Sequence, residues 1–129
     1  MKILIIVGVL AVVAVAYGFE VAAVVKFRND LSRCSKDMDE LSSNPSIDNL
    51  HCVMIKDGKM LKPNGEYDPK VALKRLADLM SDSGRVEVAH ALFNKCYKEA
   101  VDSGVIGAEQ TKQVLTCSKA ILYMVDKIN

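Results

Sequence analysis

The sequence has no tryptophan, only three phenylalanines and four tyrosines among 129 residues, and no excess of charge of either sign. The formal net charge is +1, without a basic block, so we expect no nucleic-acid partner. It contains no Cys-x-x-Cys pair, which disfavours a zinc site, and we expect no metal or other cofactor. It also lacks an N-glycosylation acceptor, because Pro45 occupies the forbidden position between Asn44 and Ser46.

Residues 1–18 have the pattern of a secretory signal peptide. Lys2 precedes an apolar run, and the small residues Ala16 and Gly18 offer cleavage sites at its end. The run is shorter than the roughly 20 residues that a membrane-spanning helix needs, which favours a signal peptide over a membrane anchor. We therefore predict a secreted, extracellular protein without stable membrane insertion, cut after Gly18, with one domain over residues 19–129.

All four cysteines follow the predicted cleavage site, at Cys34, Cys52, Cys96 and Cys117. An even number of cysteines in a small secreted chain predicts two disulfides. Four cysteines allow three pairings, and the residue pattern alone leaves these open. Each cross-link would stabilise a chain with such a modest core by roughly 3 kcal/mol.

Apolar residues recur at helical spacing along the whole mature chain. Ser46 and Asp68 are suited to cap helices, Gly58 to end one, and Asn64-Gly65 to form a turn. Strand signals are nearly absent. We therefore predict a compact all-α domain of five or six helices, with a loop over residues 36–45 that holds at most one helical turn. The predicted helices cover residues 20–35, 47–57, 69–80, 85–102 and 108–128.

The sequence offers no catalytic centre. A catalytic histidine needs a nucleophile and an orienting group within reach. The two histidines are His51 and His90, the cysteines are expected in disulfides, and no serine stands in a recognised elbow. We therefore expect that the protein is not an enzyme. Protonation of a histidine near pH 6 would allow a pH-dependent release of ligand, and a solvated surface histidine is the simpler interpretation.

The cysteine spacing resembles that of the insect odorant-binding proteins, the pheromone and general odorant-binding proteins. The four cysteines are separated by 17, 43 and 20 residues, and CVMIKDGKMLKPNGEYD from Cys52 onward is similar to the family's helical turn, Lys-x-Gly break, Asn-Gly turn and aspartate. The chain is most similar to the minus-C subgroup, which keeps four of the family's six cysteines. The two absent cysteines would fall at Asp48 and Ala108, and in the family they bond to each other, so their joint absence leaves no orphan thiol.

The resemblance covers about residues 20–128 and implies that Cys34 pairs with Cys52 and Cys96 with Cys117. The segment between Cys34 and Cys52 is shorter than in the family. The missing portion corresponds to the second helix and its flanking loop, so we predict a shortened second-helix region and a thin wall there.

The resemblance also implies a carrier for a small hydrophobic ligand, such as an odorant, a pheromone or a similar aliphatic molecule, held in an apolar cavity between helices. Ordinary core packing is the alternative for each candidate lining residue. Because aromatic residues are few, we expect a preference for flexible aliphatic ligands. A chemosensory receptor or a second copy of the chain is the candidate protein partner. The candidate lining residues are Val53, Met54, Leu73, Leu76, Met80, Leu92, Leu115, Leu122 and Met124.

Two other functions are alternatives to the carrier. A secreted interaction protein of gland, venom or hemolymph would bind a macromolecule and need no ligand cavity, and the short Cys34 to Cys52 segment agrees with it. A membrane-active amphipathic toxin is disfavoured, because no predicted helix has the basic polar face that such a toxin needs.

Overall fold

The computed structural model describes residues 19–39 and 44–127. The predicted signal peptide lies outside the described residues. Within them, the β structure is confined to an isolated bridge between Leu61 and Tyr67. The predicted all-α fold is therefore confirmed. The helices are α2 (Val21–Asp37), α3 (Ile47–Asp57), α4 (Pro69–Asp78), α5 (Ser83–Asp102), α6 (Gly107–Ser118) and the 3-10 helix η1 (Lys119–Met124).

The predicted helix ends are formed by the expected residues. The Ser46 side chain accepts a hydrogen bond from Asn49 N at 3.2 Å and caps α3, whose C-cap is Gly58 in the left-handed conformation at φ 80°. Asp68 caps α4 by accepting from Val71 N at 3.4 Å, with proline in the first turn. These local signals therefore set where the two helices begin and where α3 ends.

The last helix differs from the prediction of one α-helix over residues 108–128. α6 ends at Ser118 and continues as the 3-10 helix η1. The Ser118 hydroxyl donates to Val114 O at 2.6 Å, the kind of side-chain bond to the preceding turn that bends helices. After η1 the backbone becomes extended at Val125, and Asp126 N donates to Leu79 O at 3.0 Å. The chain thus leaves the helix to bond to the end of α4.

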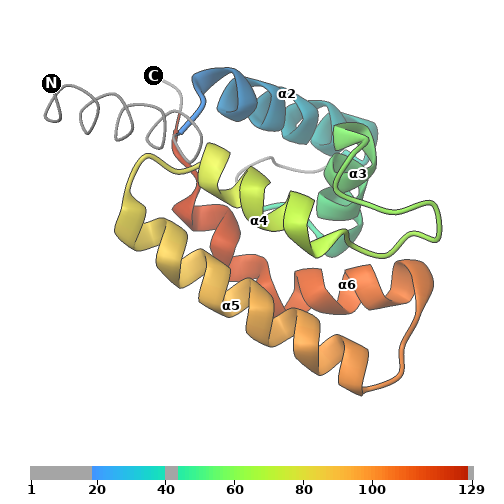
Figure 1. Cartoon of the computed structure of the whole chain (residues 1–129). Coiled ribbons are helices and arrows are strands. Elements are labelled where there is room, and N and C mark those ends of the chain that lie inside the picture. The colour runs from blue at the N-terminus through green and yellow to red at the C-terminus, as the bar shows by residue number, and fades with distance from the viewer. Residues whose placement is uncertain (1–18, 40–43, 128–129) are drawn as a thin grey trace, which may run out of the picture.

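The helices form two disulfide-linked pairs with α4 between them (Figure 1). Cys34 of α2 is bonded to Cys52 of α3, and Cys96 of α5 is bonded to Cys117 of α6. α4 packs against both α2 and α5, while α3 packs against α6. The pairing implied by the family resemblance is the one in the structure. Between α2 and α3 the described residues 38–39 and 44–46 form no helix, in agreement with the predicted shortened second-helix region.

The loop between α3 and α4 is tied to the start of α6. Thr111 Oγ1 donates to Gly65 O at 2.6 Å, and Gly107 N donates to the Glu66 carboxylate at 2.9 Å. Gly65 has φ 87°, and a Cβ at this position would lie 3.2 Å from Ala108 N, so a larger residue does not fit without strain. This anchoring holds the loop against the helices, where it contributes buried side chains to the core.

Candidate ligand-binding cavity

An apolar cavity of about 90 Å³ lies between the helices. Every described helix and the α3–α4 loop contribute side chains to its wall. The polar lining residues are Lys26, Asp30, Asp57, Arg75, Ser118 and Lys119. The other lining residues are Ala23, Phe27, Leu50, Val53, Met54, Met60, Tyr67, Ala72, Leu76, Leu79, Phe93, Leu115, Ile121, Leu122 and Val125.

The structure brings five of the nine predicted lining residues together on this wall, namely Val53, Met54, Leu76, Leu115 and Leu122. The other four predicted residues do not line this cavity. Leu73 and Leu92 are only partly buried against the core, and Met80 is 2% exposed within it but is not part of the cavity wall. Met124 belongs to η1, where three residues per turn instead of 3.6 change which positions share a face.

Two lining residues were not predicted, because no periodicity in the sequence indicates them. Met60 and Tyr67 come from the α3–α4 loop, which has no helical periodicity, and they are only 6% and 4% exposed. By contrast, Leu50, Phe93 and Ile121 lie on apolar helix faces and could have been named from periodicity.

Aromatic side chains form a larger part of the wall than their number in the sequence suggests. Phe27, Tyr67 and Phe93 all line the cavity, and the expected preference for aliphatic ligands stays a prediction. The Tyr67 ring meets Phe93 edge to face at 5.2 Å, and Phe93 stacks on Tyr97 at 5.9 Å. Burial raises the pKa of Tyr67, so its hydroxyl stays protonated at physiological pH.

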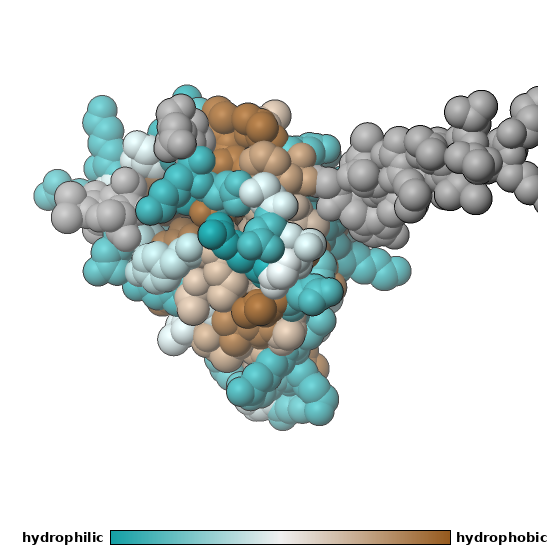
Figure 2. Space-filling view, turned by 90° about the vertical axis from the view of Figure 1, so that its left-hand side faces the viewer, coloured by the Kyte–Doolittle hydropathy of each residue, from teal (hydrophilic) through white to brown (hydrophobic). Residues whose placement is uncertain are grey.

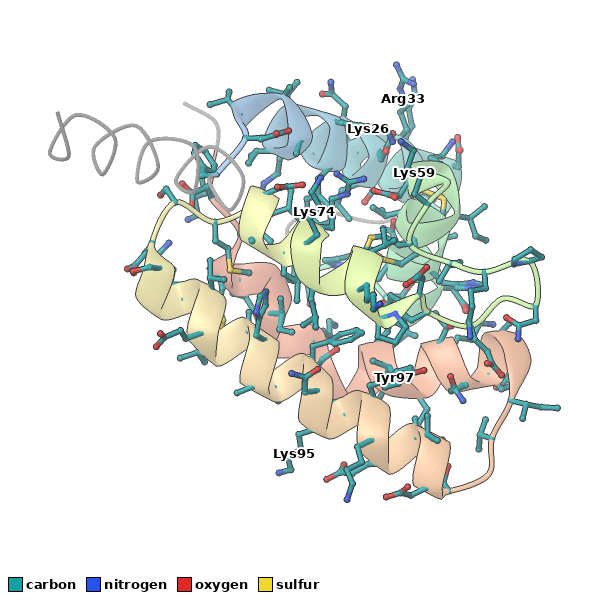
Figure 3. The ribbon with its side chains drawn as sticks, in the orientation of Figure 1. Lys26, Arg33, Lys59, Lys74, Lys95 and Tyr97 are labelled. Carbon is teal, nitrogen blue, oxygen red and sulfur yellow. A yellow bond between two sulfur atoms is a disulfide. The ribbon has the colours of Figure 1, made fainter. Side chains whose placement is uncertain are left out.

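Charged residues on the cavity wall link three helices. Lys26 of α2 is paired with Asp30 at 2.8 Å and also donates to Lys56 O of α3 at 3.2 Å. Arg75 of α4 is paired with Asp57 of α3 at 2.8 Å. Figure 3 shows Lys26 on α2 and Lys74 on α4. The Lys26 side chain is 55% exposed, so these paired charges lie where the cavity approaches solvent.

The C-terminal segment closes another part of the cavity. Val125 lines it, and Arg28 of α2 donates to Val125 O at 3.0 Å and to Asp126 O at 3.1 Å. The Asp126 carboxylate accepts from the Ser81 hydroxyl at 2.6 Å and from Ser81 N at 3.1 Å. The segment is therefore tied both to α2 and to the α4–α5 loop.

The Asp126 contacts predict an acid-sensitive part of the stability. Hydrogen bonds from Ser81, with nearby Arg85 and Arg28, hold the pKa of Asp126 below its usual value of 3.8. A carboxyl with a lowered folded-state pKa stabilises the fold above its unfolded pKa and loses this contribution as pH falls through the folded value. We expect Asp126→Asn to be less stable than the parent at pH 6, and the difference to shrink below about pH 3.8. Urea unfolding across this range measures it, and a constant difference would contradict it.

Neither histidine lines the cavity. His51 is half-buried on α3, and burial, with Lys112 nearby, lowers its pKa. His90 Nε2 lies 2.8 Å from Leu73 O. All four cysteines are in disulfides, and the described part of the chain has no group of three or more His, Cys, Asp or Glu side chains placed to hold a metal.

The exposed surface carries apolar side chains in separate groups. On the face in Figure 2, two apolar areas are divided by a hydrophilic band. The most exposed large apolar residues are Val21, Ile106 and Tyr123, from different elements of the chain. Scattered exposure of this kind is normal and does not by itself indicate a docking surface. None of the helices within residues 19–39 and 44–127 is long and apolar enough to span a membrane.

Comparison with known families gives one match. The family model described as the ant venom allergen Sol i 2 family matches residues 33–122. This range contains all four cysteines and most of the elements that line the cavity. No curated protein and no solved structure matches this chain.

Proposed function

Because this chain belongs to the ant venom allergen Sol i 2 family, which is an insect odorant-binding-protein-like family, we propose that it is a secreted carrier for a small hydrophobic ligand and not an enzyme. The observation that carries the proposal is the cavity of about 90 Å³, whose wall is formed mostly by apolar side chains. Ligand sites are typically concave and apolar, with a few polar groups that orient the ligand. Removing apolar ligand surface from water would supply roughly 25 cal/mol per Å².

The size of the cavity limits what binds without rearrangement. An apolar cavity of about 150 Å³ is large enough for benzene, and this one is smaller. Met54 and Met60 lie on the wall, and methionine side chains adapt their shape easily. We therefore expect short aliphatic ligands to fit first and longer ones to bind by displacing these two side chains.

The minus-C relationship is part of the proposal. The two cysteines that the minus-C subgroup lacks would fall at Asp48 on α3 and at Ala108 on α6. Lys112, one turn after Ala108, forms an ion pair with Asp48 at 3.4 Å. An ionic contact therefore joins the two helices near where the family has its third disulfide. The Asp48 side chain is 73% exposed and the Lys112 side chain 35%, so the contact contributes much less than a disulfide would.

Secretion is supported by three features. The signal-peptide pattern of residues 1–18, the two disulfides and the membership in a venom allergen family all agree with an extracellular location. A receptor or a second copy of the chain as a protein partner, and a histidine-dependent release at low pH, stay predictions.

Displacement of a fluorescent apolar probe tests the carrier directly. We expect the mature protein to bind the probe saturably, and fatty alcohols or esters to displace it at micromolar concentration. Short-chain ligands should displace the probe at lower concentration than long-chain ligands, because the cavity is small. A folded protein that binds neither probe nor ligand would reject the carrier and favour the secreted interaction protein of gland, venom or hemolymph.

A further inference from the structure

The Tyr67 hydroxyl is a neutral polar group on a cavity wall that is otherwise mostly apolar. Tyr67 is 4% exposed and lines the cavity, and none of the hydrogen bonds among residues 19–39 and 44–127 involves its hydroxyl. The hydroxyl is not among the fully enclosed side-chain atoms that lack a partner in this part of the chain, so it keeps some accessible surface. Because the residue is almost entirely buried and lines the cavity, the cavity is where this hydroxyl can find a partner, as tyrosine hydroxyls in protein interiors usually do.

The Tyr67 ring is held in place from several sides. Its backbone bridges to Leu61, and the adjacent Glu66 carboxylate accepts from Gly107 N at 2.9 Å. The edge-to-face contact with Phe93 has an interplanar angle of 87°. A donor fixed in this way loses little conformational freedom when a ligand binds, so it can orient the ligand.

Most other polar groups on the wall already have partners. Lys26 is bonded to Asp30, Arg75 is bonded to Asp57, and the Ser118 hydroxyl donates to Val114 O. Lys119 is a partly exposed cation at the start of η1. A hydrated ammonium group gains little by leaving water for a neutral ligand. Tyr67 is therefore the neutral donor best placed for a ligand inside the cavity.

We infer that Tyr67 is the specificity-determining residue of the cavity, and that it donates a hydrogen bond to an acceptor oxygen of a small neutral ligand. The ligand class is an aliphatic ketone, ester, ether or alcohol, with the hydrocarbon part against the apolar wall. This inference rests on the proposed carrier function. It goes beyond that function by adding one required polar atom to a ligand otherwise chosen by size and hydrophobicity.

The test compares 2-hexanone with heptane, which have the same number of heavy atoms, on the mature protein and on Tyr67→Phe. The variant keeps the ring and its contact with Phe93 and removes only the hydroxyl. We expect it to bind 2-hexanone roughly three- to tenfold more weakly, the range for loss of one hydrogen bond, while its affinity for heptane is unchanged. The carbonyl stretch of bound 2-hexanone should lie at lower frequency in the parent than in the variant.

A control variant makes the outcome specific. Tyr97→Phe removes a hydroxyl from the other tyrosine that contacts Phe93, but Tyr97 does not line the cavity, so neither affinity should change. The inference is overturned if Tyr67→Phe weakens both ligands equally, weakens neither, or leaves the carbonyl stretch where it was. If neither ligand binds the parent protein, the carrier function itself fails.

Discussion

Replacing Ala72 by leucine is expected to weaken binding of an apolar ligand about tenfold or more, a loss of at least about 1.4 kcal/mol. Ala72 on α4 is fully buried and lines the cavity. The three added carbons would occupy much of a space of about 90 Å³ that the ligand needs. Affinities for an apolar probe and for a fatty alcohol, measured by fluorescence, give the result.

The control for this variant lies on the same helix. Ala77 is 8% exposed but is not part of the cavity wall, so Ala77→Leu should cause a similar packing disturbance and leave the affinity within about twofold. Urea unfolding of both variants checks that they are folded. Equal affinity of Ala72→Leu and the parent would show that ligands do not enter this cavity.

Removing the Cys96–Cys117 disulfide by Cys96→Ala together with Cys117→Ala is expected to lower the free energy of unfolding by about 3 kcal/mol. The bond closes a loop with a sequence separation of 21 residues, and it joins α5 to α6. A chain of this size has a modest core, so about 3 kcal/mol is a large share of a typical stability of 5–15 kcal/mol. Urea unfolding monitored by circular dichroism measures the change.

The second disulfide supplies a matched comparison. Cys34 and Cys52 have a similar sequence separation of 18 residues, so the corresponding double variant should lose a similar amount. A loss below about 1 kcal/mol in both double variants would contradict the stabilising role given to these bonds.

Local sequence signals predicted most of the fold, because they act over one turn of helix. The caps at Ser46 and Asp68 and the left-handed Gly58 fixed the ends of α3 and α4. The disulfide pairing came from the family resemblance and not from these signals. The change from α6 to η1 was not predictable in the same way, because Ser118 is compatible with a helix and its bond to Val114 O is one of several options for a serine.

The cavity was predicted only in part, for two physical reasons. Tyr67 reaches the wall because its loop is tied to α6, a contact between segments far apart in the sequence. In addition, a helix packed on two neighbours has apolar residues that face different partners. On α4, Leu76 faces the cavity while Leu73 lies near His90 of α5, and periodicity does not separate these two roles.

The methionine methyl groups provide the most direct measurement of where a ligand binds. Met54 and Met60 line the cavity, whereas Met80 is buried elsewhere in the core and Met38 is 37% exposed at the end of α2. In a titration of methyl-labelled mature protein with an aliphatic ester or alcohol, followed by NMR, the chemical shifts of the Met54 and Met60 methyl groups should change saturably, while those of Met38 stay constant. Shifts that follow Met38 alone, or that do not saturate, would contradict a ligand bound in the cavity.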